Sequence, residues 1–171
     1  GVHQGAAQTW DGERLHLYTC PLGALSSRLP RVERRPFTLP SRTYADPSTT
    51  AGAPSKSANN PYRDVIVRLP QNEHEPEIPI GVVSKRYHLI QHSELLDAVV
   101  EGLKAINLQW EKLWTDVRLT ELGTRLHFTI HLPKAYRADI NNDALDLTVE
   151  CLNSVDRSWA FRVGMGWIRL V

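Results

Sequence analysis

The segment from Arg125 to Leu132 constrains the fold of this 171-residue chain more than any other segment. Its residues, RLHFTIHL, alternate between polar and apolar side chains without a break. Because successive side chains of a β-strand point to opposite faces, the pattern predicts a strand with one apolar and one polar face. The apolar set is Leu126, Phe128, Ile130 and Leu132, and the polar set is Arg125, His127, Thr129 and His131.

The spacing of apolar residues predicts one main amphipathic helix over about residues 93–107. Ser93 is a suitable N-cap, and Glu94 and Asp97 place negative charge near the N-terminal end, where the helix dipole favours it. Strand candidates at residues 64–69, 80–91, 117–132 and 147–152 surround this helix in the sequence. Short local connections between them predict an α+β fold, a mostly antiparallel sheet with the helix packed on one face. The apolar helix face is Leu95, Leu96, Val99, Val100, Leu103 and Ile106.

The last residues of the chain predict a hairpin. Residues 159–163 alternate as a strand, Gly164-Met165-Gly166 is typical of a turn, and residues 167–171 begin a second apolar run. We expect Trp159 and Phe161 to be buried against the helix face between Val99 and Leu103. Because the chain stops inside the apolar run, we also expect a core that is truncated at its C-terminal end.

The chain divides into three predicted parts. Residues 1–45 form an N-terminal arm, in which Asp11-Gly12 predicts a short hairpin. Residues 46–60, with the sequence DPSTTAGAPSKSANN, have the composition of a flexible linker or long loop. Residues 61–171 form the α+β core.

The overall charge is nearly balanced, with 20 Lys and Arg against 19 Asp and Glu. A net charge of +1 excludes a strong general attraction to nucleic acid or to a membrane surface. Apolar runs long enough to span a membrane are missing from the sequence. Cys20 and Cys151 are far apart in the sequence, which fits a reducing cytoplasm, although a single disulfide between them remains an alternative.

The polar residues do not predict catalysis. His127 and His131 share a strand face but lie about 13 Å apart, too far to bind one metal ion. The sequence has no phosphate loop, nucleophile elbow or Cys-x-x-Cys pair. We therefore assign no catalytic residue, metal ligand or cofactor, and an enzyme is the least favoured class.

A polar strand face rich in arginine is the remaining signal. If neighbouring strands bring its residues together, they form a basic patch that can contact phosphates. The alternative is that these residues only keep an exposed sheet face soluble, which is the more common role of scattered arginines in such a pattern. The candidate nucleic-acid-binding residues are Arg118, Arg125, His127, His131, Arg162 and Arg169.

Three segments resemble one protein family. They are GVVSKRYHLIQ at residues 81–91, LTELGTRLHF at residues 119–128, and LNSVDRS at residues 152–158 together with the later Arg162-Val163 and residues 169–171. In this order they are similar to the phage- and plasmid-borne family called domain of unknown function 932. Two positions depart from the family pattern: Val155 stands where the family has His, and Arg157 stands where it has Gly.

The resemblance implies a mobile-element accessory protein in a bacterial cytoplasm, without an established activity. Our leading hypothesis is a nucleic-acid-binding module in DNA metabolism that favours single-stranded DNA. The alternative is a protein-interaction module that acts on a host defence or repair factor through the basic, proline-rich segment Arg28–Arg42. An oligomer is compatible with either function.

Overall fold

The computed structural model describes residues 9–10, 12–40, 43–44, 53–54, 56–136, 138–140 and 143–169. These residues form a mostly antiparallel, α+β arrangement with two short α-helices, α1 (Leu22–Leu25) and α2 (His92–Ala105). Single turns of 3-10 helix add η1 (Ser26–Arg28), η2 (Trp110–Lys112) and η3 (Lys134–Tyr136). The described helices are all too short or too polar to cross a membrane.

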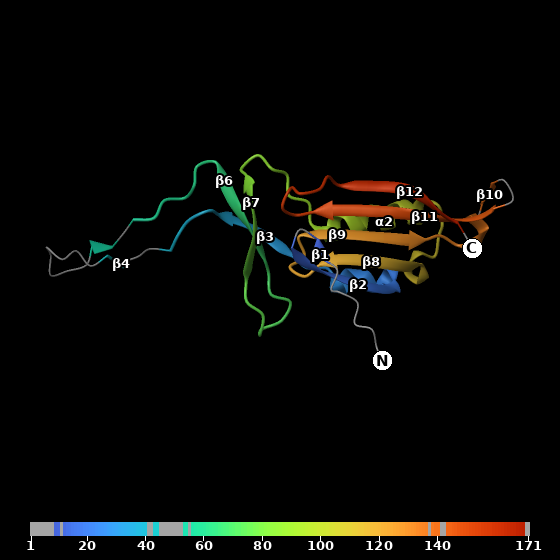
Figure 1. Cartoon of the computed structure of the whole chain (residues 1–171), viewed down its shortest axis with the longest axis horizontal. Helices are drawn as coiled ribbons and strands as arrows, with labels where there is room; N and C mark the ends of the chain where they lie inside the picture. The colour runs from blue at the N-terminus through green and yellow to red at the C-terminus, as the bar shows by residue number, and fades with distance from the viewer. Residues whose placement is uncertain are drawn as a thin grey trace.

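The main sheet has seven strands in the order β1-β2-β8-β9-β11-β10, and β12 pairs with β11 on the side opposite β10 (Figure 1). All neighbouring strands are antiparallel. The pairing of β1 with β2 confirms the predicted N-terminal hairpin. The strands are β1 (Thr9–Trp10), β2 (Glu13–Pro21), β8 (Trp114–Thr120), β9 (Arg125–His131), β10 (Ala138–Ile140), β11 (Asp143–Ser154) and β12 (Arg162–Arg169).

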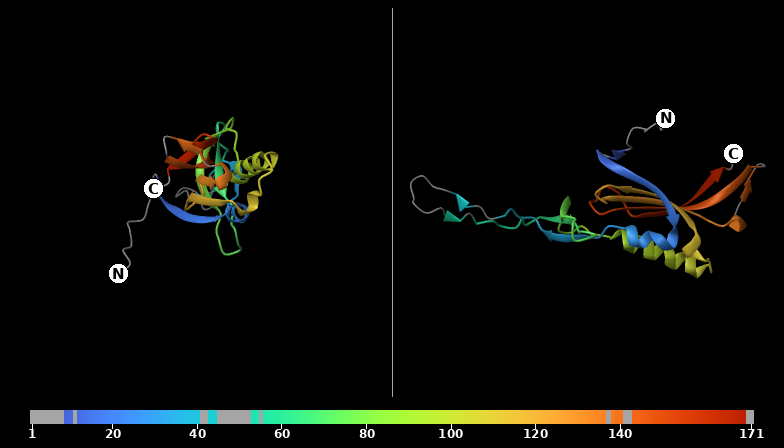
Figure 2. Two further views of the ribbon diagram at one scale, coloured as in Figure 1. Left: turned by 90° about the vertical axis from the view of Figure 1, so that its right-hand side faces the viewer. Right: turned by 90° about the horizontal axis from the view of Figure 1, so that it is seen from below.

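The helices α1 and α2 lie on one face of the main sheet, and no described helix covers the opposite face, which we call the open face (Figure 2). On the covered face, Leu126, Phe128 and Ile130 of β9 have no exposed surface, as the alternation of this strand predicts. They pack with the apolar side of α2, including Leu95 and Val99, in one hydrophobic cluster. Around β9, the covered face of the sheet therefore supports the fold, and the open face carries the polar positions.

A smaller three-stranded sheet lies beside the main sheet, in the order β3-β6-β7 (Figure 1). Its strands are β3 (Val32–Pro36), β6 (Arg63–Arg68) and β7 (Ile78–Ser84). A second hydrophobic cluster of Val32, Ile66, Val83 and Val155 joins it to the end of the main sheet. Beyond it, β4 (Thr43–Tyr44) pairs with β5 (Ala53–Pro54).

Strands from both sides of the predicted linker pair with each other, since β3 pairs with β6 and β2 pairs with β8. Residues 46–52 and 55 of that linker lie outside the described residues. The predicted division into arm, linker and core therefore stays a prediction.

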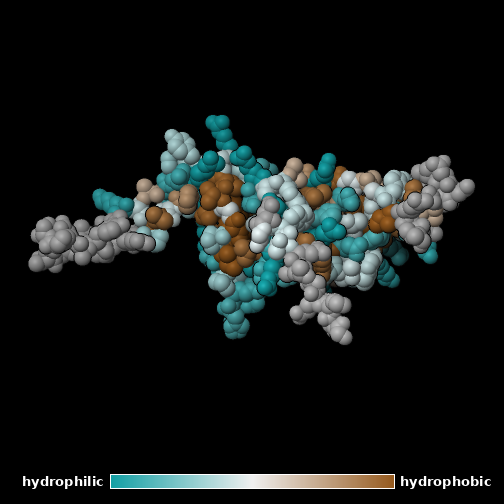
Figure 3. Space-filling model, viewed as in Figure 1, coloured by the Kyte–Doolittle hydropathy of each residue, from teal (hydrophilic) through white to brown (hydrophobic). Residues whose placement is uncertain are grey.

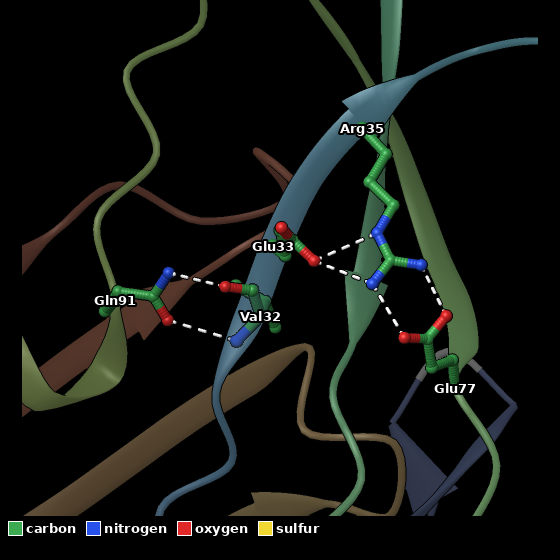
Figure 4. Close-up of polar contacts among 5 residues, drawn as sticks. All are labelled: Val32, Glu33, Arg35, Glu77 and Gln91. Carbon is green, nitrogen blue, oxygen red and sulfur yellow. Dashed lines mark hydrogen bonds and ion pairs between the residues drawn. The ribbon is translucent and has the colours of Figure 1, made fainter.

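Gln91, rather than the predicted Ser93, precedes the first residue of α2. Its backbone N–H donates to Glu94 Oε2 at 2.6 Å. Its side-chain amide donates to the carbonyl of Val32 at 2.8 Å and accepts from the N–H of Val32 at 3.1 Å (Figure 4). One residue thus begins the helix and fastens it to β3. The prediction of Ser93 as N-cap was wrong. The Gln91 side chain at the start of the helix is held by Val32, which lies 59 positions earlier in the sequence.

The predicted C-terminal hairpin was also wrong. Gly164, Met165 and Gly166 lie inside β12, which pairs with β11 without interruption from Arg162 to Arg169. A side chain at Gly166 would come within 2.8 Å of the Thr148 hydroxyl, so glycine at this position allows β12 to lie against β11. Residues 155–161, which include the half-buried Trp159, connect the two strands as a loop. Phe161 is 42% exposed.

Candidate functional site

The open face of the main sheet carries a row of side chains that crosses five strands. Cross-strand pairing places Leu17 opposite Arg118, Arg118 opposite His127, His127 opposite Leu152, and Leu152 opposite Arg162. We call these five residues the cross-strand row. It brings together three of the residues predicted from the sequence, Arg118, His127 and Arg162, of which the two arginines are exposed.

The neighbouring positions on this face are acidic. Asp116 and Glu150 both lie opposite Thr129, one on each side of it. His131, another predicted residue, bonds to the Asp116 carboxylate through Nε2 at 2.6 Å. Figure 3 accordingly shows mostly hydrophilic residues over the main sheet, with isolated hydrophobic ones among them. The face therefore has alternating positive and negative positions rather than one continuous basic patch.

His127 sits in the middle of the cross-strand row and is half-buried. Its partial burial lowers the pKa of the imidazole, and the positive charge of Arg118 lowers it further, whereas the Glu150 carboxylate raises it. The ring is thus disfavoured as a cation at neutral pH. The positive charge of the row comes from Arg118 and Arg162.

Arg125 belongs to an aromatic cluster at one end of the open face. Its Nε donates to the Ser158 hydroxyl at 2.7 Å, and its guanidinium lies over the Trp159 ring, 5.2 Å from the ring centroid. Trp159 in turn meets Trp10 edge to face, with the ring centroids 4.1 Å apart. The cluster of Trp10, Trp159 and Arg125 thus joins β1 to the loop between β11 and β12.

Two hollows flank the loop that contains Trp159, Ala160 and Phe161. The first hollow has a volume of about 480 Å³ and is lined by these three loop residues together with Leu152, Ser158 and Arg162. It therefore connects the end of the cross-strand row to the aromatic side chains. The second, about 300 Å³, is lined on its other sides by Tyr87, His88, Ile90, Asn153, Ser154 and Arg157.

Arg169 does not share a face with the rest of the predicted set. It is seven positions after Arg162 in one uninterrupted strand, and an odd separation places two strand positions on opposite faces. The prediction grouped them because it assumed a turn at Gly164–Gly166. Its register partner is Leu145, at the far end of β11 from Leu152.

The segments that carry the family resemblance meet beside the second hollow. The Tyr87 hydroxyl donates to the carbonyl of Ser154 at 3.3 Å and accepts from the N–H of Arg157 at 3.2 Å. A side chain at Gly81 would come within 2.9 Å of the Asp156 Cβ, so a glycine is needed where β7 crosses this loop. Residues that are some 70 positions apart in the sequence therefore form one structural unit.

The two positions that depart from the family pattern have different environments. Val155, which stands in place of His, is completely buried in the second hydrophobic cluster. Arg157, which stands in place of Gly, is exposed and has a φ angle of +71°. That left-handed conformation is the one that glycine adopts without strain.

A buried polar pair, His92 and Asn153, lies behind the second hollow. The His92 Nε2 donates to the carbonyl of Gly123 at 2.6 Å, and its Nδ1 accepts from the Asn153 amide at 3.1 Å. The same amide nitrogen donates to the carbonyl of Ile90 at 2.9 Å. Burial lowers the pKa of His92 to about 4, so the ring is neutral at pH 7, with one donor and one acceptor.

Sequence reasoning missed this pair, because it assigned no role to His92 or Asn153. Position 92 nonetheless precedes Leu95, Leu96 and Val99 by three, four and seven residues. That spacing puts it on the apolar face of α2, and it is the signal that could have identified His92 as buried.

The described residues contain no group of three or more His, Cys, Asp or Glu that could hold a metal ion. Cys20 and Cys151 are buried free thiols, so they do not form the disulfide that the sequence left open. Burial raises the pKa of Cys151 to about 12, which keeps its sulfur protonated and unreactive at neutral pH.

Comparison with known protein families gives a match. A family model described as domain of unknown function (DUF932) matches residues 79–171. No curated protein and no solved structure matches the chain. The matched residues begin at β7 and include α2, β8, β9, β11 and β12, and therefore most of the open face.

Proposed function

The chain belongs to the DUF932 family, whose description assigns no activity, and we propose from the geometry of the open face that the protein binds single-stranded nucleic acid. The observation that supports this most is the first hollow. It places Arg162 beside Trp159 and Phe161, at the end of a row that also contains Arg118. Arginine is a donor for phosphate, and an aromatic ring is a stacking surface for any base.

Single strands are favoured over duplex for a geometric reason. Duplex readers commonly insert a helix into the major groove, whereas α2 packs its apolar side on the opposite face of the sheet. Bases of a single strand are free to stack on exposed rings and to enter a hollow. A hollow of about 480 Å³ is within the ordinary size of a small-ligand pocket.

The mixed charge of the open face limits the expected affinity. Asp116 and Glu150 repel phosphates close to the row, and the net charge of the chain is only +1. With two or three phosphate contacts, the logarithm of the binding constant should fall with the logarithm of salt concentration with a slope of about −2. We therefore propose weak, salt-sensitive binding.

The proposal is tested by fluorescence anisotropy with a labelled oligothymidine of about 20 nucleotides, first at low salt and then at moderate salt. The double variant Arg118→Ala/Arg162→Ala should bind at least tenfold more weakly. The matched control is Arg63→Ala/Arg86→Ala, which removes two exposed arginines of the small sheet and the turn after it. Undetectable binding at low salt, or equal binding by both double variants, contradicts the proposal.

As a second candidate, we propose a protein-interaction site in the segment Arg28–Arg42. Arg34 contacts Asp64 at 3.6 Å, and Arg35 pairs with Glu33 and Glu77 (Figure 4), so these two arginines already have partners. The observation that supports this second candidate is the exposure of two apolar side chains in the same segment, Phe37 and Leu39. Pull-down from a bacterial lysate should lose a partner when Leu39 is replaced by Asp, and an unchanged partner set contradicts this candidate.

The biological setting belongs to the same proposal. A role as an accessory protein of a phage or plasmid, in a bacterial cytoplasm, is supported by the family resemblance of residues 81–91, 119–128 and 152–158. Binding to single strands fits the DNA metabolism of such elements. The oligothymidine binding assay and the lysate pull-down test whether the partner in that setting is a nucleic acid or a host protein.

A further inference from the structure

Strand β12 forms a long edge of the main sheet. Its eight residues, RVGMGWIR, pair with β11 on one side, and no described strand pairs with its other side (Figure 1). An edge strand exposes a row of backbone N–H and C=O groups that can pair with another chain. The length of β12 makes this row the longest such edge among the described strands of the main sheet.

The other edges among the described strands are shorter or interrupted, and β12 is neither. Proteins protect sheet edges with very short strands, prolines, bulges or charges. β1 has two residues and β10 has three. β2 has no described strand on the outer side of residues 15–21, and this edge ends at Pro21. β7 contains Pro79, its register with β6 shifts near Ile66, and β3 ends at Pro36. β12 has no proline and no register shift, and its arginines stand only at its two ends.

The side chains of β12 are apolar and exposed. Val163, Met165 and Trp167 lie opposite Cys151, Val149 and Leu147, and therefore on the covered face, yet they are 49%, 62% and 50% exposed. α2 leaves this part of the covered face open, because an apolar hollow of about 290 Å³ runs between α2 and β12. On the other face, Ile168 is 42% exposed.

We propose that this edge binds a second copy of the chain, by antiparallel pairing of β12 with β12 about a twofold axis at Met165. In this register Val163 lies opposite Trp167 of the second copy, Gly164 opposite Gly166, and Arg162 opposite Ile168. No like charges are opposed. Because facing positions have the same parity, the covered face of one copy continues into the covered face of the other.

The available surface supports a modest affinity. Phe161, Val163, Met165, Trp167 and Ile168 are each 42–62% exposed. At about 100 Å² of accessible surface for each half-exposed large side chain, they supply roughly 500 Å² per copy. That area, with one ladder of backbone hydrogen bonds, is near the lower end for specific interfaces, so we expect a dissociation constant in the micromolar range. The inference does not depend on the proposed nucleic-acid function.

The first experiment measures the mass of the 171-residue chain by light scattering on size-exclusion chromatography, from about 1 to 200 µM. As the concentration rises, we expect the measured mass to increase from that of a monomer to that of a dimer and no further. Met165→Lys, which places two like charges opposite each other, should weaken the dimer at least tenfold. Leu17→Lys is the control, because Leu17 is 51% exposed on β2, far from this edge in the strand order.

The second experiment tests the register itself. Residues directly opposite each other in antiparallel strands have Cα atoms about 5 Å apart, which a disulfide can span. A Met165→Cys variant should therefore form a covalent dimer under mild oxidation. Val163→Cys should not, because the two copies of that residue lie about 13 Å apart in the proposed register. A monomer at 200 µM, a dimer insensitive to Met165→Lys, or equal cross-linking at both positions overturns the proposal.

Discussion

The two faces of the main sheet differ in what their side chains contact. Leu126, Phe128 and Ile130 of β9 point into a core that excludes water, and they have no exposed surface. His127 and Thr129, which alternate with them, lie on the open face. His127 is opposite Arg118 and Leu152, and Thr129 is opposite Asp116 and Glu150. The same strand therefore contributes to stability through one set of positions and, in our proposal, to recognition through the other. Substitutions on the two faces should have separable effects.

The largest effect should follow from removing a side chain on the covered face. Phe128→Ala leaves a cavity in the centre of the core, and we expect it to lower the free energy of unfolding by about 3–5 kcal/mol. His127→Ala, one residue earlier on the open face, should change it by less than about 1 kcal/mol. Urea denaturation followed by tryptophan fluorescence measures both. Similar losses for the two variants would break the distinction between the faces.

The second largest effect should be a dependence of stability on pH, because the buried His92 is neutral in the folded protein. Its pKa is about 4 in the folded protein and 6.5 for an ordinary histidine, so the unfolded chain binds more protons between these values. Stability conferred by the neutral ring is complete above pH 7 and is lost as the pH falls to about 4. The loss should be about 3 kcal/mol.

The control for the pH effect is His92→Gln, which removes the titrating group and retains a donor and an acceptor. Denaturation curves at several pH values should show a flatter dependence for this variant than for the unaltered protein. Parallel curves would mean that other groups are responsible.

These two faces were partly predictable from the sequence. The alternation of β9 is a local, period-2 signal, and it separated the buried Leu126, Phe128 and Ile130 from the half-buried polar positions between them. Gly164-Met165-Gly166 misled the prediction. Gly166 is needed because a side chain at this position would collide with Thr148, 18 residues away, and not because the chain turns there. No local pattern distinguishes such a glycine from one that makes a turn.

The candidate site shows the same limit. Arg118, His127 and Arg162 share a face by parity, which the sequence indicates. Their alignment in one row depends on strand register, which is set by long-range pairing. The acidic neighbours Asp116 and Glu150 follow from the same register. Burial of His92 was readable from its helical spacing, whereas its partner Asn153 was not.

A smaller effect is expected in the loop that joins the covered and open faces. Val155→His restores the residue of the family but buries an imidazole among Val32, Ile66 and Val83, which should cost about 1–3 kcal/mol. Ser158→His, three residues later and exposed, serves as the control. Thermal denaturation compares the stabilities of the two variants. An undiminished stability of Val155→His would show that this cluster tolerates a polar group.

The smallest stability effect should be a gain. Arg157→Gly relieves a left-handed backbone conformation that costs an ordinary residue about 1 kcal/mol, although glycine also gives the unfolded chain more freedom. We expect a net increase in the free energy of unfolding of at most about 1 kcal/mol. Urea denaturation checks the sign. A decrease would indicate that the Arg157 side chain makes a stabilising contact.

We propose that the open face binds single strands, whereas the covered face holds the fold. The most direct test of this proposal measures binding and stability together in Arg118→Ala/Arg162→Ala. We expect at least a tenfold loss of affinity for a labelled oligothymidine at low salt, with the free energy of unfolding unchanged within about 0.5 kcal/mol. Full binding by this variant, or a loss that appears only because the protein unfolds, would contradict it.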